Sequence, residues 1–197
     1  PVINMKDLND AMMKILAGPE KRSRVRLEKD RRLTAIHEAG HAVAMYHLPE
    51  HDPVHQISII PRGRALGLTW TQPREDSDHL TRNQMYQQIV GLLGGRVAEA
   101  LFLKDISTGA SNDIEQATKL ARAMITRYGM SQDFDMVALE TVSNQYLGGD
   151  TALACSAETA AEHDRQVAAL VKKQPAQASQ TLEDTQAQRH HMPQSHH

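Results

Sequence analysis

The sequence of 197 residues contains few cysteines and few aromatic residues. Its single cysteine, Cys155, excludes an intramolecular disulfide framework and any zinc site built from several thiolates. Aromatic residues make up only 4% of the chain, so its hydrophobic core must be built from alanine, leucine, isoleucine, valine and nine methionines. Such side chains suit closely packed helices better than the faces of a β-sandwich. We therefore expect a mainly α protein.

An excess of charge and long apolar runs are also missing. The 22 lysine and arginine residues are balanced by 24 aspartate and glutamate residues. The chain therefore has no strong field that would favour nucleic acid or an anionic membrane surface as a partner. No apolar run approaches the roughly 18 residues of a transmembrane helix, and no signal peptide opens the chain. We expect a soluble polypeptide with no nucleic-acid partner.

The spacing of apolar residues predicts several helices and one small β-hairpin. The predicted helices cover residues 4–17, 21–48, 81–104, 112–128 and 157–173, and the hairpin strands cover residues 55–60 and 66–71. Gly129 is expected to end the fourth helix, and the glycines within residues 91–95 are expected to allow close helix packing. Residues 174–197 are rich in Gln, Ala, Ser and His and have no clear apolar face, which predicts a low-complexity, disordered tail.

A His-Glu-x-x-His motif lies at residues 37–41, within the second predicted helix. Residues four apart share one helix face, so His37 and His41 can bind the same metal ion. Glu38 then lies next to the ion, where a general base toward a water molecule is needed. Both histidines share the inward-facing apolar stripe of the helix, where unpaired imidazoles would be costly. These features favour metal binding over an ordinary structural role.

A catalytic zinc site needs a third protein ligand, and the sequence offers two candidates. His47 follows His41 by six residues, an offset known from other zinc proteases, but Ala44 replaces the glycine of that pattern. The helix is therefore expected to carry His47 away from the ion. Asp113 opens another predicted helix, although an acid in a first helical turn is common for dipole reasons alone. The residues themselves leave this choice open.

Five blocks of the sequence stand out for their composition and order. They are residues 37–42 (HEAGHA), 59–63 with 65–67 (IIPRG and ALG), 93–96 (LGGR), 108–113 (TGASND) and 128–131 (YGMS). Together they resemble the peptidase domain of the FtsH-type family, the membrane-anchored, ATP-dependent zinc metalloproteases. The resemblance implies a helical, zincin-like peptidase domain that binds one Zn²⁺ per chain. It implies that His37, His41 and Asp113 bind the metal and that Glu38 is the catalytic base.

The resemblance also implies a domain organisation and partners. Residues 1–19 are expected to be a leading helix and linker from an upstream module, residues 20–173 the metallopeptidase domain, and residues 174–197 the tail. Members of the family form homo-hexamers and degrade unfolded or membrane-extracted proteins, on the cytoplasmic side of the inner membrane. The sequence has no G-x-x-x-x-G-K-[ST] loop, so we expect that this chain does not bind ATP and that the ATPase module and membrane anchor lie outside it.

The segment Ala65, Leu66 and Gly67 is expected to bind substrate. An extended peptide can add to it as a β-strand, which reads the main chain and predicts low sequence specificity. A plain hairpin that closes one side of the domain explains the same segment equally well. The leading hypothesis is a zinc endopeptidase. The alternatives are a catalytically idle assembly module of a protease ring and a metal-free helical scaffold.

Overall fold

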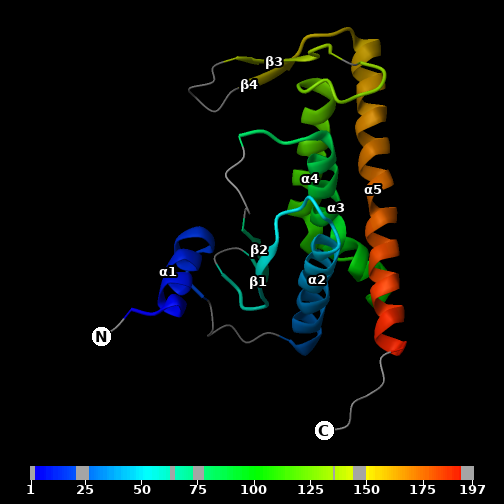
Figure 1. Cartoon of the computed structure of the whole chain (residues 1–197). Helices are drawn as coiled ribbons and strands as arrows, with labels where there is room; N and C mark the ends of the chain where they lie inside the picture. Colours follow the sequence, from blue (N-terminus) through cyan, green and yellow to red (C-terminus); the bar gives the residue numbers. More distant parts are fainter. Residues whose placement is uncertain are drawn as a thin grey trace.

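The computed structural model describes residues 3–20, 27–62, 65–72, 78–134, 136–143 and 150–191. The described part contains five α-helices and two antiparallel hairpins (Figure 1). The helices are α1 (Met5–Ala17), α2 (Glu28–Tyr46), α3 (Arg82–Ala98), α4 (Ser111–Thr126) and α5 (Ala157–His191). Strand β1 (Val54–Ser58) pairs with β2 (Leu68–Thr71), and β3 (Glu140–Ser143) pairs with β4 (Asp150–Leu153). The prediction of a mainly α fold with a small β-hairpin is confirmed.

Two short elements join α3 to α4. A π-helix, η1 (Glu99–Leu103), continues α3, and a 3-10 turn, η2 (Thr108–Ala110), leads into α4. Lys104 ends η1 in the left-handed region, with a φ of 56°. After α4, Gly129 turns the chain with a φ of 59°, and the Met130 N–H donates to the Met124 carbonyl at 2.9 Å. The C-cap of α4 is Arg127, so Gly129 does not cap the helix as predicted. It turns the chain two residues later, with a φ that glycine adopts without strain.

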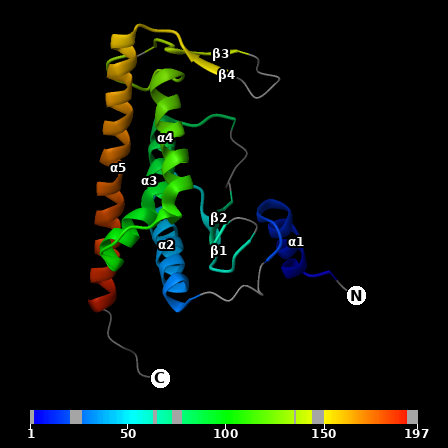
Figure 2. The ribbon, with the colours of Figure 1, turned by 180° about the vertical axis from the view of Figure 1, so that it is seen from behind.

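The hydrophobic core lies where α3 packs among α2, α4 and α5, which Figure 2 shows from behind. Two buried clusters form it, and their buried members are aliphatic side chains, joined by two methionines in the first cluster, as the low aromatic content requires. The first joins α3, α4 and α5 through Met85, Ile89, Leu93, Ala117, Ala121, Met124, Ile125 and Val167. The second joins α3 to the C-terminal half of α5 through Leu48, Val90, Val97, Ala98, Ala178 and Leu182.

Helices α2 and α3 touch through their backbones at Gly40 and Gly94. A Cβ added at Gly94 would lie 2.7 Å from the Gly40 carbonyl oxygen and 2.9 Å from the Ala44 Cβ. A Cβ added at Gly40 would lie 2.5 Å from the Ala98 Cβ. Any side chain at either position would overlap the opposite helix, so the pair of glycines permits this approach. The expectation of close packing at Gly94 is confirmed.

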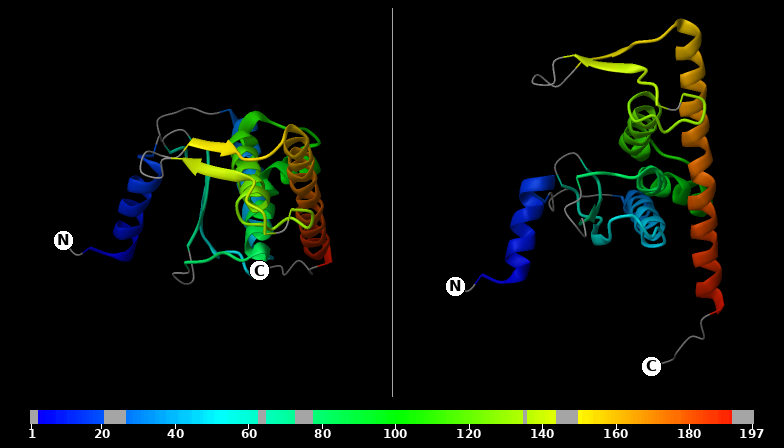
Figure 3. Two further views of the ribbon diagram at one scale, coloured as in Figure 1. Left: turned by 90° about the horizontal axis from the view of Figure 1, so that it is seen from above. Right: turned by 45° about the horizontal axis from the view of Figure 1, so that its top comes forward.

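Helix α1 stands apart from the other helices, beside the first hairpin (Figure 3). It begins with a capping box formed by Asn4 and Asp7. Met13 is its buried residue, whereas most of its other apolar side chains are exposed. The exposed residues are Met5, Leu8, Met12, Ile15 and Leu16.

Two expectations about the C-terminal part of the chain are wrong. The helix expected to end at Lys173 continues as α5 to His191, so residues 174–191 are helical and not disordered. Ala178 and Leu182 are buried against the second cluster, which compensates for the hydrogen bond lost at Pro175. The sequence also predicted one hairpin only, whereas β3 and β4 form a second one before α5. Among the helices of the described residues, none is both long and apolar enough to cross a membrane.

Candidate metal centre

Three potential ligand side chains meet between α2 and the first turn of α4. His37 and His41 project from one face of α2, and Asp113 comes from the start of α4. The Nε2 atom of His37 lies 3.0 Å from the Nε2 atom of His41 and 3.2 Å from Asp113 Oδ2, and His41 Nε2 lies 3.5 Å from the same oxygen. Two imidazole nitrogens and one carboxylate oxygen form a donor set suited to a catalytic zinc ion. These residues could therefore hold a metal.

Helix α3 and its π-helical extension hold the other nitrogen of each imidazole. The Nδ1 atom of His37 donates to Glu99 Oε1 at 2.7 Å, and the Nδ1 atom of His41 donates to the Gly91 carbonyl at 2.8 Å. With Nδ1 protonated, each ring presents Nε2 to the cluster. Glu99 is fully buried, and its second oxygen accepts the Ser107 N–H at 2.7 Å. Both histidines are therefore oriented before any metal binds.

Glu99 is a site residue that was not recognised in the sequence. A signal was present, because Gly91, Gly95 and Glu99 follow one another at intervals of four and therefore share a helix face. Gly95 also contributes to the site. A Cβ added there would lie 2.6 Å from His41 Nε2 and 2.7 Å from His37 Nε2. Glycine at position 95 thus makes room for the ligand atoms, a role beyond the helix packing that was expected of it.

Glu38 is held by the first hairpin. The Thr69 hydroxyl of β2 donates to Glu38 Oε2 at 2.8 Å, and the side chain of Glu38 is buried. A Cβ added at Gly67 would lie 2.5 Å from Glu38 Oε1, so the hairpin backbone passes directly beside the carboxylate. Ala65 and Leu66 lie just before this point and are exposed. Of the three proposed substrate-binding residues, Gly67 therefore lies against Glu38, and the other two are exposed residues that precede it.

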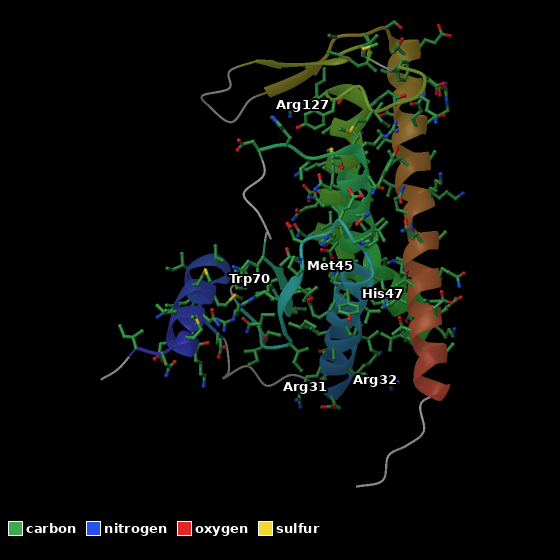
Figure 4. All side chains as sticks on the ribbon, in the orientation of Figure 1. Arg31, Arg32, Met45, His47, Trp70 and Arg127 are labelled. Carbon is green, nitrogen blue, oxygen red and sulfur yellow. The ribbon has the colours of Figure 1, made fainter. Side chains whose placement is uncertain are left out.

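His47 lies away from the cluster. It follows the last turn of α2, and its Nε2 atom is 3.3 Å from the Thr185 hydroxyl of α5. Figure 4 shows it beside α5. The helix continues through Ala44 as expected, so the offset of six residues after His41 turns His47 off the ligand face. Of the two candidates for a third ligand, Asp113 is the one that adjoins both histidines.

Burial and hydrogen bonds set the protonation of the cluster. Burial by itself lowers the pKa of His37, but its hydrogen bonds to Asp113 and Glu99 outweigh burial and raise the pKa above its usual value of 6.5. Burial raises the pKa of Asp113, but hydrogen bonds from His37 and His41 outweigh it and bring this pKa to about 2. In the metal-free protein, a protonated His37 is therefore stabilised beside an ionised Asp113.

The contact between Glu99 and His37 can be tested by titration. In metal-free protein, Glu99→Gln should lower the pKa of His37, because a neutral amide no longer favours the imidazolium. NMR titration of the ring protons measures this pKa. The control is Glu115→Gln, since Glu115 is exposed and bonded to Lys119, and it should leave the titration unchanged. An unchanged pKa of His37 in Glu99→Gln would contradict the hydrogen bond between Glu99 and His37.

The His37–Asp113 contact also predicts how the stability of the metal-free protein depends on pH. The contribution of Asp113 is present above its ordinary pKa of 3.8 and is lost as the pH falls toward about 2. The contribution of His37 is present below 6.5 and is lost as the pH rises through its raised pKa. Asp113→Asn should therefore lower the free energy of unfolding most, by about 2 kcal/mol, near a pH of about 5. The loss should be smaller at a pH of about 2 and at a pH of about 9. Urea unfolding with a chelator measures this cost.

The control for this pH dependence is Glu28→Gln. Glu28 forms an exposed ion pair with Arg31 at 3.2 Å, and such pairs contribute little to stability. The free energy of unfolding of this variant should follow that of the wild type across the same pH range. A flat pH dependence for the cost of Asp113→Asn would mean that the two groups do not interact as described.

Comparison with known proteins identifies the family. Residues 24–195 match the sequence model of peptidase family M41. The ATP-dependent zinc metalloprotease FtsH of Caldicellulosiruptor bescii is 48% identical over 183 residues, which cover 91% of this chain and 30% of that protein. FtsH 1 of Thermoanaerobacter sp. is 48% identical over 185 residues, covering 92% of this chain and 30% of its own length.

A third relative is also similar to this chain over most of its length. The ATP-dependent zinc metalloprotease FtsH of Thermus thermophilus is 46% identical over 172 residues, covering 87% of this chain and 27% of that protein. The chain thus spans less than a third of the length of these curated relatives. Because the family match extends over most of the sequence and agrees with the cluster between α2 and α4, this chain belongs to peptidase family M41, the FtsH type of zinc metalloprotease.

Proposed function

We propose that this chain is the proteolytic domain of an FtsH-type protease and that it hydrolyses peptide bonds of unfolded or membrane-extracted proteins. The observation that carries the proposal is the buried Glu38 carboxylate, fixed by Thr69 and next in sequence to the first histidine of the cluster. A base in this position is what hydrolysis by an activated water requires. An idle assembly module would have no need for such a base, so the intact set of residues favours the enzyme.

We assign His37, His41 and Asp113 as the ligands of one zinc ion. The donor set and the separation of the ligand atoms, all within 4.8 Å of one another, support this assignment. Glu99 and the Gly91 carbonyl take the Nδ1 protons, so that both Nε2 atoms are available as ligands. A bound zinc ion would lower the pKa of a water molecule and polarise the scissile carbonyl.

Glu38 is the general base in this proposal. It accepts a proton from the attacking water and then transfers it to the leaving amine nitrogen. Thr69 donates to one carboxylate oxygen, and the Gly67 backbone lies close to the other, so both restrict rotation of the carboxylate. A base that is already oriented needs little reorganisation when the substrate arrives.

The segment Ala65, Leu66 and Gly67 would bind an extended substrate. Strand β2 follows this segment and pairs with β1 along one edge, and among the described residues no third strand pairs with its other edge. A peptide added there would run past Gly67 and bring its main chain close to Glu38. Because strand addition reads backbone groups, the cleavage should show low sequence specificity.

The dependence on ATP belongs to a larger assembly in this proposal. The relatives are named ATP-dependent, whereas these 197 residues contain no G-x-x-x-x-G-K-[ST] loop. An ATPase module outside these residues would unfold the substrate, and a membrane anchor outside them would hold the domain at the membrane. In this context the domain would function as a homo-hexamer on the cytoplasmic side of the inner membrane.

The ligand assignment is tested by comparing two variants. Asp113→Ala should lose tight zinc binding, since it removes a ligand, while His47→Ala should keep one zinc ion per chain. Competition with a zinc indicator, together with the metal content after dialysis, measures both. Retention of zinc by Asp113→Ala with loss in His47→Ala would reverse the assignment. Absence of zinc in the wild type would support the metal-free scaffold.

The catalytic assignment is tested with unfolded casein as substrate. Glu38→Gln should bind zinc normally and cleave about 1,000-fold more slowly than the wild type, within the range found when a general base is removed. Glu28→Gln, on the exposed first turn of the same helix, is the control and should cleave at the wild-type rate. If the zinc-loaded wild type does not cleave casein, the endopeptidase proposal fails for this chain. Normal cleavage by Glu38→Gln would exclude this residue as the base.

A further inference from the structure

Arg62 is a buried cation outside the metal cluster. It lies in the connection between β1 and β2, and only 4% of its surface is exposed. A guanidinium in such a position needs charged or hydrogen-bonding partners, because it has lost its hydration. Its partners are the carboxylate of Glu20, with which it forms an ion pair, and the carbonyl of Gly18 at 3.4 Å. Both partners lie in the short segment that follows α1.

The backbone of Arg62 pairs both with the segment that follows α1 and with the start of the segment that leads into β2. Arg62 forms an isolated antiparallel bridge with Glu20 and another with Ala65. The Arg62 N–H donates to the Ala65 carbonyl at 3.0 Å, and the Ala65 N–H donates to the Arg62 carbonyl at 2.8 Å. The same residue therefore contacts the segment after α1 through its side chain and backbone, and the start of the proposed substrate-binding segment through its backbone.

The segment from Ala65 to Thr69, which begins next to Arg62, packs closely against Glu38. Ala65 is two residues from Gly67, whose backbone passes so close to Glu38 Oε1 that a Cβ there would lie at 2.5 Å. Thr69, two residues further on, donates to Glu38 Oε2 at 2.8 Å. A shift of this segment would therefore move both the Thr69 hydroxyl that donates to Glu38 and the Gly67 backbone that lies beside it. Displacements of about 1 Å are enough to slow catalysis strongly.

We propose that Arg62 is a positioning residue for Glu38 and that its pair with Glu20 couples the position of α1 to the active site. This inference rests on the proposed role of Glu38 as the base. Arg62 itself is neither a proposed metal ligand nor the proposed base. It assigns a role to the arginine of the Ile-Ile-Pro-Arg-Gly block, which the metal chemistry leaves without one.

Trp70 provides a direct probe of the hairpin. It is the single tryptophan of the chain, it follows Thr69 in β2, and it packs against His55 of β1 with ring centroids 4.7 Å apart. Figure 4 shows it on the hairpin between β2 and α1. Its fluorescence reports the state of the hairpin whether or not the protein cleaves substrate.

The experiment compares zinc-loaded wild type with Glu20→Gln, Arg62→Lys and the double variant, using an unfolded, fluorescently labelled casein peptide. Each single variant should lower kcat about tenfold, keep KM within about twofold and keep one zinc ion per chain. The double variant should be no slower than the slower single variant, because both changes break one contact. The emission of Trp70 should shift in all three.

The matched control is the exposed ion pair between Arg31 and Glu28 at the start of α2, at 3.2 Å. Arg31→Lys and Glu28→Gln should change neither kcat nor the Trp70 emission. Unchanged kcat in the Glu20 and Arg62 variants, or a loss that only follows a loss of zinc or of folded protein, would overturn the inference while leaving the base assignment intact. If the wild type itself does not cleave, an unchanged Trp70 emission in these variants would still overturn the coupling.

Discussion

The direct contact between the backbones of α2 and α3 determines the geometry of the site. Helices with ordinary side chains at their contact pack with axes about 8–10 Å apart, and glycines at Gly40 and Gly94 remove the side chains that would keep these two apart. This approach brings the Gly91 carbonyl and the Glu99 carboxylate within hydrogen-bond distance of the two imidazoles. The centre thus depends on the absence of side chains at one face of α3 as much as on the ligands that α2 provides.

The two sides of α2 are stabilised in different ways. On the side of α3, buried polar groups satisfy one another, since Glu99 accepts from both His37 and the Ser107 backbone. On the side of the hairpin, Glu38 depends on a single hydroxyl from a two-stranded sheet. A sheet of this size has little stability of its own. The two histidines are therefore held by the helical core, whereas the base is held by a small sheet with little stability of its own.

Local patterns in the sequence predicted the local structure, and tertiary contacts explain what they missed. The interval of four residues between His37 and His41 defines a helix face by itself, so this half of the centre was predictable. The choice between Asp113 and His47 depends on where the packing of α2 and α4 against α3 brings the start of α4, which spacing within one helix cannot determine. The helical stretch after Pro175 was missed because Ala178 and Leu182 become buried only through contact with distant residues.

The second hydrophobic cluster has a consequence for synthesis of the protein. It packs Leu48, just after α2, together with Ala178 and Leu182 near the end of α5, so its members come from distant parts of the sequence. The residues of the metal centre, in contrast, are all present once Asp113 has been made. During translation, the ligands can therefore meet before the core is complete, and the domain can reach full stability only after most of α5 has left the ribosome.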